Sequence, residues 1–358
     1  MNQPNPAELL NNASLQAACE LMRSPDASGV GPSVPTEIWE RALIEPATAF
    51  LSRSGKGFRG RLVSLGWMLA GGRPGHCPAA LHAAIELLHN GSLIVDDIED
   101  AAEERRGAPA LHRTHGVPIA LNTGNWMYFA GLKMLASLEI PVQTRANLVG
   151  TAVLRDHDAC VAALQRDAID TLMRCHHGQA LDIATAIHAV HQADVEAMVQ
   201  TSTTLKTGSL MGLALRLGAR AATDNGSLVE AIGRFGEQVG IGLQMLDDVG
   251  CVLGTQRRHK AIEDLRSAAP TWAWVWTVEG LDELSFARLQ RDARGVHEGH
   301  GDAHALLQAM MMRLEHTGKA RVAAWLNRAF TELRALVGAH PALSAVRQEI
   351  ERLRRSYA

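Results

Sequence analysis

Aromatic side chains are scarce in this chain of 358 residues, which contains only two Tyr and six Phe although 47% of its residues are hydrophobic. The core must therefore be built mainly from Ala, Leu, Val and Ile. Ala and Leu favour helices, and the chain lacks the alternating Val, Thr and Tyr runs that are typical of strands. The composition predicts an all-α protein that is long enough to bury a full core.

Other absences narrow the class of protein. The net charge of −3 gives no bulk attraction to nucleic acid. No apolar run is long enough to cross a bilayer, and the start, MNQPNPAELL, lacks the basic and apolar parts of a signal peptide. The scattered cysteines form no CxxC motif, which favours a reducing cytosol over a disulfide scaffold. We expect one cytoplasmic domain over residues 1–358, with no nucleic-acid partner, no transmembrane segment, and an N-terminal arm at 1–35.

Acidic residues are concentrated in the stretch from Leu87 to Pro109. Asp96, Asp97, Glu99 and Asp100 fall within five positions, after an apolar run with helical spacing. On a helix Asp96 and Asp100 share one face, and their mutual repulsion would be offset by a hard cation such as Mg²⁺. Arg105 and Arg106 follow, and guanidinium groups bind phosphate well. This arrangement favours a diphosphate site; the alternative is a solvated acidic helix end followed by a basic turn.

A second acidic pair lies far downstream, in the sequence LQMLDDVGC. Gln244, Asp247 and Asp248 stand within about one turn at the end of a predicted helix over 225–250. A predicted loop with basic residues, including Lys260, follows directly. Two acidic helix ends that face one cavity would form a metal cage for a phosphorylated ligand, whereas the ordinary alternative for the basic run is a solvated loop.

Three further positions are candidates, each with an ordinary alternative. Lys56 and Arg59 stand among glycines at the start of an apolar helix, as either an anion site or a basic turn. His89 lies two turns before Asp96, as either a ligand-facing or a core histidine. Lys206 and Thr207 precede Gly208, where a broken helix would expose backbone groups to a cavity; the alternative is a lysine that snorkels from a core helix.

Taken together, these motifs resemble the trans-type (head-to-tail) isoprenyl diphosphate synthases, and geranylgeranyl diphosphate synthases in particular, over residues 50–275. The resemblance consists of six motifs in the family's order: GKxxR at 55–59, the histidine at 89, DDxxD at 96–100 followed by RRG at 105–107, GQxxD at 178–182, Lys-Thr at 206–207 and QxxDD at 244–248.

The resemblance implies an antiparallel helix bundle around a deep central cavity, usually in a homodimer, with the two acidic motifs facing each other at its mouth. It implies that three Mg²⁺ ions bind to Asp96, Asp100 and Asp247. The allylic diphosphate would be held by Arg105, Lys206 with Thr207, and Lys260, while Gln244 orients the reacting groups. Isopentenyl diphosphate would be held by Lys56, Arg59, His89 and Arg106.

Product length is also implied by the resemblance. The growing chain would pass the fifth and fourth positions before the first acidic motif, which are Gly91 and Ser92. Synthases that make the C15 product often carry an aromatic residue there, so these small residues imply a longer product. Trp126, Tyr128 and Phe129 could form a floor lower down, which favours the C20 product, geranylgeranyl diphosphate.

Two departures and two alternatives accompany this interpretation. Cys251 stands where the second acidic motif would end in Asp, and a lysine expected near Ala269 is missing, with Arg266 as a possible substitute. A class I terpene cyclase on the same scaffold could dispense with the isopentenyl diphosphate residues, but this chain keeps them. A non-catalytic partner subunit of a prenyl synthase could dispense with the metal carboxylates, and this chain keeps those too.

Overall fold

The computed structural model describes residues 16, 35–53, 55, 57–139, 156–254 and 258–357. The predicted N-terminal arm lies almost wholly outside these residues, as do Lys56 and Arg257. The chain forms two compact units, one of Met1–Ile169 with Ala214–Val229 and the other of Asp170–Leu213 with Glu230–Ala358. The helices α9, α11 and α12 each contribute residues to both units. The single domain expected from the sequence stays a prediction.

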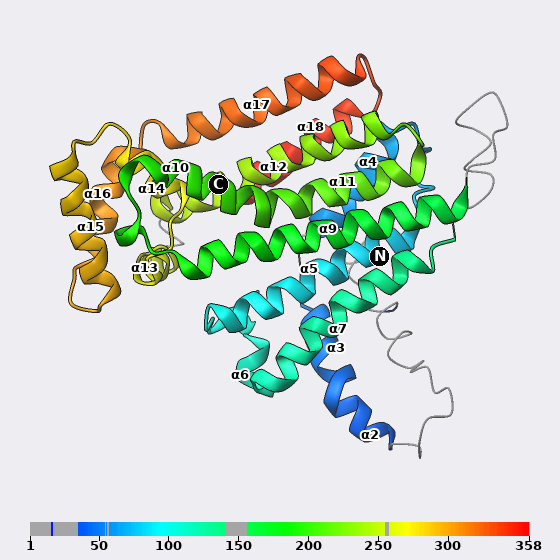
Figure 1. Ribbon diagram of the computed structural model, residues 1–358, viewed down its shortest axis with the longest axis horizontal. Helices are drawn as coiled ribbons and strands as arrows, with labels where there is room; N and C mark the ends of the chain where they lie inside the picture. The colour runs from blue at the N-terminus through cyan, green and yellow to red at the C-terminus, as the bar shows by residue number, and fades with distance from the viewer. Residues whose placement is uncertain are drawn as a thin grey trace, which may run out of the picture. The chain divides into compact units, whose positions relative to one another are not determined.

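The described part of the first unit is helical apart from one short hairpin (Figure 1). Its elements are α2 (Thr36–Trp39), the π-helical turn η1 (Glu40–Ile44), α3 (Glu45–Leu51), α4 (Phe58–Leu69), α5 (Ala79–Glu99), β1 (Glu104–Arg105), β2 (Ala108–Pro109), α6 (Leu111–His115), α7 (Val117–Ala136), the first part of α9 (His157–Ala184), most of α11 (Ser209–Ala222) and the start of α12 (Gly226–Leu253). The helix expected from the apolar spacing before Asp96 is therefore confirmed as α5.

The two helices α5 and α7 lie side by side and antiparallel, in close contact through small residues (Figure 1). Gly91 of α5 lies against the backbone of Gly124, and Gly131 of α7 lies against Leu88. A core cluster from α3, α5, α6 and α7, which includes Phe50, packs beside this contact. This packing fixes the last turns of α5, which carry the first acidic motif.

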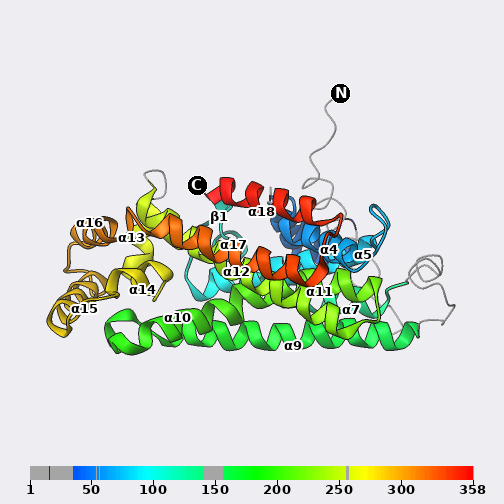
Figure 2. The ribbon, with the colours of Figure 1, turned by 90° about the horizontal axis from the view of Figure 1, so that it is seen from above.

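The second unit is also helical, and α13 to α16 pack against one another at one end of it (Figure 2). Its elements are the rest of α9, the 3₁₀ turns η2 (Ile187–Ala189) and η3 (Gln192–Asp194), α10 (Val195–Thr203), the π-helical turn η4 (Thr204–Gly208), the first residues of α11, most of α12, α13 (Arg258–Ser267), α14 (Trp272–Val278), α15 (Glu283–His297), α16 (Ala303–Leu314), α17 (Gly318–Val337) and α18 (Leu343–Tyr357).

Two local predictions in this unit are wrong. The basic residues from Arg258 to Lys260, expected in a loop, form the first turn of α13. The helix around Lys206 is not broken at Gly208; it widens into the π-helical turn η4 and continues as α11. A π-helical turn inserts an extra residue without ending the helix, and such turns are frequent at functional sites.

The all-α architecture expected from composition is confirmed, because helices account for nearly all the regular structure of the described residues. None of the described helices is both long and apolar enough to cross a membrane.

Candidate functional site

The first acidic motif occupies the end of α5. Asp96 lies half-buried in the last turn, and Asp100 is the exposed residue that ends the helix, with its N–H donating to the Asp96 carbonyl (2.9 Å). The C-terminal end of a helix carries partial negative charge, so carboxylates are unfavourable there without a counter-charge. The structure therefore places two acids on a face where a cation is needed.

Arg105 supplies part of that positive charge. Its Nε donates to Asp97 Oδ1 at 2.7 Å, its Nη2 also contacts Asp97, and Nη2 lies 3.5 Å from Asp96 Oδ2. Burial raises the pKa of Asp97, an effect that Arg105 partly counteracts. Arg105 thus ties the hairpin to the acidic end of α5.

Arg106 occupies the turn of the β1–β2 hairpin in an unusual backbone conformation. Its φ is +56°, and that of Gly107 is +74°. A left-handed conformation costs a residue with a side chain about 1–2 kcal/mol. The Arg106 guanidinium lies over the Phe50 ring, 5.7 Å from its centre, and occupies the space where a side chain at residue 55 would begin. Strain of this kind persists where surrounding contacts hold it, and it is frequent at functional sites.

Arg59 and His89 lie together in the same unit. Arg59 Nη1 and His89 Nε2 are 2.8 Å apart. Burial, with Arg59, Arg106 and Arg105 nearby, holds the pKa of His89 well below its ordinary value. The imidazole is therefore neutral near pH 7, with Nε2 accepting from Arg59 and Nδ1 carrying the proton. Nδ1 is buried and has no hydrogen-bond partner among the described residues, so its N–H is an unsatisfied donor.

The five positions assigned to product length differ in their surroundings. A side chain at Gly91 would meet the Gly124 carbonyl oxygen at 2.7 Å, so this position faces α7. Ser92 is half-buried, and its hydroxyl donates to the His89 carbonyl (2.8 Å). Trp126 packs against the core cluster, and Tyr128 is half-buried. Phe129, with 70% of its surface exposed, cannot form a cavity floor within this unit.

In the second unit the candidate residues form a chain of hydrogen bonds. Thr207 Oγ1 donates to Gln244 Oε1 (3.0 Å), and Gln244 Nε2 donates to Asp248 Oδ1 (2.8 Å). Asp248 Oδ2 accepts from the backbone N–H of Trp272 (2.9 Å). Burial raises the pKa of Asp248 to about 7, although these hydrogen bonds oppose the rise. The network fixes the orientation of Gln244 beside the acidic pair.

Two lysines in this unit are paired with carboxylates. Lys206 Nζ lies 3.1 Å from Asp182 Oδ2, and Lys260 Nζ lies 3.0 Å from Asp247 Oδ2. Burial would lower the pKa of Lys260, but Asp247 and other acidic neighbours raise it above its ordinary value. All three cations that the resemblance assigns to the allylic diphosphate, Arg105 included, thus lie beside carboxylates.

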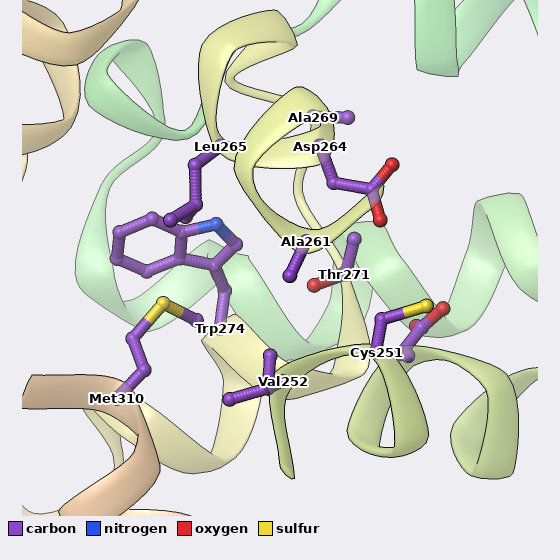
Figure 3. A pocket seen from close by; sticks show the side chains of 10 residues that line it. Cys251, Val252, Ala261, Asp264, Leu265, Ala269, Thr271, Trp274 and Met310 are labelled. Carbon is purple, nitrogen blue, oxygen red and sulfur yellow. The ribbon is translucent and has the colours of Figure 1, made fainter. Parts of the chain in front are cut away.

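The departures from the family pattern meet at one small pocket. Cys251, Asp264, Ala269 and Thr271 are among its lining residues, and its volume of about 20 Å³ is enough for one water molecule. Figure 3 shows Leu265, Trp274 and Met310 on one side and Cys251, Thr271 and Asp264 on the other. Burial raises the pKa of Asp264 to about 6, while Lys260 opposes the rise. The thiol of Cys251 and the methyl group of Ala269 occupy the positions where the resemblance expects an aspartate and a lysine.

The carboxylates fit Mg²⁺ by their chemistry rather than as a finished cage. Within the described ranges, no three His, Cys, Asp or Glu side chains are grouped closely enough to hold a metal ion. Mg²⁺ is normally bound through one or two carboxylates together with water and substrate phosphates. Asp96 and Asp100 in the first unit, and Asp247 in the second, each offer hard oxygen donors of the kind that Mg²⁺ prefers.

Sequence reasoning missed two residues of the first unit. Glu86 is buried and its Oε1 accepts from the Gly60 N–H (2.9 Å), which satisfies a donor in the first turn of α4. A lone acid in the apolar run AAIELLHN was the signal for it. Arg53 contacts the hairpin backbone, since its Nη1 donates to the Arg105 carbonyl (3.3 Å). No sequence pattern marked Arg53.

Several known proteins are similar to this chain. A geranylgeranyl pyrophosphate synthase of Zymoseptoria tritici is 28% identical over 67% of this chain and 64% of its own length. A counterpart from Dictyostelium discoideum is 29% identical over 61% of this chain and 62% of its own length. The chain thus spans less than two thirds of the length of these relatives.

Solved structures share the fold. A geranylgeranyl pyrophosphate synthetase from Pyrococcus horikoshii superposes with a TM-score of 0.71 at 22% identity, covering 98% of this chain and 96% of that one. A geranylgeranyl pyrophosphate synthase from Corynebacterium glutamicum, complexed with isoprenyl diphosphate and magnesium, gives 0.72 at 18% identity, covering 98% and 99%.

The polyprenyl synthetase family model matches residues 40–313, which include every candidate residue described above. With the fold, the acidic helix ends and this match in agreement, the chain belongs to the polyprenyl synthetase family.

Proposed function

We propose that this protein is a Mg²⁺-dependent prenyltransferase that condenses isopentenyl diphosphate with an allylic diphosphate to give a trans-polyprenyl diphosphate. The observation that carries the proposal is that Arg59, His89 and Arg106 lie together in the first unit, beside the acidic end of α5. This group would bind a second diphosphate, which chain elongation needs and cyclisation does not. The family match and the relatives named as synthases support the same reaction.

The charged side chains suggest how the reaction proceeds. When bound, Mg²⁺ supplies Lewis-acid stabilisation of the diphosphate leaving group, and Asp96, Asp100 and Asp247 would hold it, with three ions expected from the resemblance. Arg105, Lys206 and Lys260 would stabilise the charge that develops as the allylic C–O bond breaks. Arg59, Arg106 and the Nδ1–H of His89 would hold isopentenyl diphosphate while its double bond attacks the allylic carbon. Lys56 and Thr207 would add further donors.

A proton must then leave the new chain, and no described side chain is needed to take it. The departing diphosphate is itself a base, so it can accept this proton. Gln244, fixed by Thr207 and Asp248, would orient the reacting groups. The neutral residues at Cys251 and Ala269 would weaken leaving-group stabilisation and slow ionisation without preventing it.

We propose geranylgeranyl diphosphate as the product. Ser92 is small and half-buried, so it would let a chain longer than C15 pass, and the relatives with this name make the C20 assignment the best supported.

The test is a product assay with Mg²⁺, isopentenyl diphosphate and, separately, C5, C10 and C15 allylic diphosphates, with dephosphorylated products identified by mass spectrometry. A C20 alcohol is expected. A cyclic hydrocarbon from an allylic diphosphate alone would establish a terpene cyclase, and no turnover would favour a non-catalytic partner subunit.

We propose that the protein works as a homodimer in the cytoplasm. Val117, Leu121 and Phe129 expose 47%, 40% and 70% of their surface along α7, an apolar stripe that a second copy would cover. The scattered cysteines, which form no CxxC motif, support the cytoplasmic location.

Phe129→Glu is expected to shift the protein from dimer to monomer in sedimentation velocity, because a buried charge without a partner is strongly unfavourable at an interface. Glu139→Gln, on the exposed segment after α7, is the control and is expected to leave the dimer intact. A Phe129→Glu protein that sediments as the wild type does would show that α7 is not the interface.

A further inference from the structure

The β1–β2 hairpin needs support that it does not supply itself. Its turn places Arg106 in a left-handed conformation, and only four residues form the two strands. Arg105 is held by its side chain, which is bound to Asp97. Within the described ranges no hydrogen bond or ion pair anchors Arg106, whose guanidinium lies over the Phe50 ring and beside Gly55 and is attracted by the Glu86 carboxylate. Its position therefore depends on how the hairpin backbone sits over α3.

Arg53 joins α3 to that backbone. Its Nη1 donates to the Arg105 carbonyl and its Nε donates to the Ala49 carbonyl, both at 3.3 Å. Its guanidinium also lies over the Phe50 ring, 5.3 Å from the centre, so Arg53 and Arg106 share one buried aromatic ring. Two of its donors are thus directed at main-chain oxygens, which is the pattern of a side chain that holds structure in place.

We infer that Arg53 is a positioning residue, which fixes the hairpin so that Arg106 is aimed at the diphosphate of isopentenyl diphosphate. The inference deepens the proposed function and rests on it for the identity of the ligand. Arg105 keeps its own anchor at Asp97, so the loss of Arg53 affects isopentenyl diphosphate and spares the allylic diphosphate.

The test is Arg53→Met, which keeps the length of the side chain and its apolar contact with Phe50 but removes the donors and the charge. We expect the KM for isopentenyl diphosphate to rise about 10-fold, the effect of losing a hydrogen bond from a charged group. The KM for the allylic substrate, kcat and the thermal midpoint are expected to stay near the wild-type values. Arg41→Met, on the exposed face of η1, is the matched control and should change none of them.

A double-mutant cycle separates positioning from direct contact with substrate. If Arg53 acts through Arg106, Arg53→Met adds little to Arg106→Met, and the pair has the KM of Arg106→Met alone. If Arg53 binds the diphosphate itself, the two effects multiply and the inference is overturned. An unchanged KM in Arg53→Met would also overturn it.

Calorimetric titration with isopentenyl diphosphate keeps this test apart from the test of function. If the wild-type protein turns over and Arg53→Met has the same KM for isopentenyl diphosphate, the positioning role is rejected and the synthase proposal stands. A wild-type protein without turnover would reject the synthase proposal, while a weaker Kd in Arg53→Met than in Arg41→Met would still support the role of Arg53. Equal Kd values in the two variants would reject it.

Discussion

Asp96→Ala is expected to lower kcat/KM for condensation by about 1000-fold, because the variant loses both a Mg²⁺ ligand and the charge stabilisation that depends on it. Asp96 lies at the negative end of α5 with Arg105 3.5 Å away, so its removal leaves the helix intact. The loss should therefore appear in turnover and not in the thermal midpoint. The measurement is the C20 product assay with substrates at saturating and limiting concentrations.

Glu99→Gln is the matched control for Asp96→Ala. Glu99 is an exposed acid in the same turn, and the resemblance gives it no metal role, so the variant should retain most of its activity. A second measurement is the rise in thermal midpoint that Mg²⁺ with inorganic diphosphate produces by binding the native state. That rise should vanish in Asp96→Ala and persist in Glu99→Gln. Near-normal turnover in Asp96→Ala would remove Asp96 from the metal site.

Gly91→Phe is expected to destabilise the fold by about 3 kcal/mol or more, because a side chain there would have to enter the backbone of α7. Its β-carbon alone would lie 2.7 Å from the Gly124 carbonyl oxygen and 3.2 Å from Met127. Soluble yield and the midpoint of urea unfolding are the measurements. The main role of Gly91 is therefore to allow the close contact between α5 and α7.

Ser92→Phe is the informative partner of Gly91→Phe. Ser92 is half-buried one position along α5, and an aromatic ring there should be accommodated and should shorten the main product from C20 to C15. A folded Gly91→Phe enzyme that makes the shorter product would mean that α5 can move away from α7. In that case both positions would face the growing chain.

The sequence was a good guide where a periodic pattern determines structure. The long helices α5 and α12 follow directly from apolar spacing, because burial of one face decides helix formation. The sequence motifs also assigned Arg59 and His89 to the same diphosphate, and the structure places Arg59 Nη1 2.8 Å from His89 Nε2. Local pattern and tertiary packing agree at these positions.

Other features depend on contacts that periodicity does not encode. The π-helical turn at Lys206 differs from an ordinary helix by one residue, and Gly208 alone suggested a break. The side that Gly91 faces is set by the approach of α7, a segment more than 30 residues away in sequence. Arg53 lies in an irregular stretch, so only the three-dimensional position of the Arg105 carbonyl identifies its role.

The pairing of Arg105 with Asp96, Lys206 with Asp182 and Lys260 with Asp247 gives ligand binding the character of an ion exchange. Each of these three cations, which are proposed to bind the allylic diphosphate, already has a carboxylate neighbour. Two of the proposed metal ligands, Asp96 and Asp247, already have a cationic neighbour. Under the proposed function, a magnesium diphosphate brings both signs of charge at once. The protein's cations can then pair with the diphosphate while its carboxylates pair with Mg²⁺, and no charge is left uncompensated. Mg²⁺ alone or diphosphate alone would leave one set of protein charges unpaired, so the protein would favour binding the two as one complex.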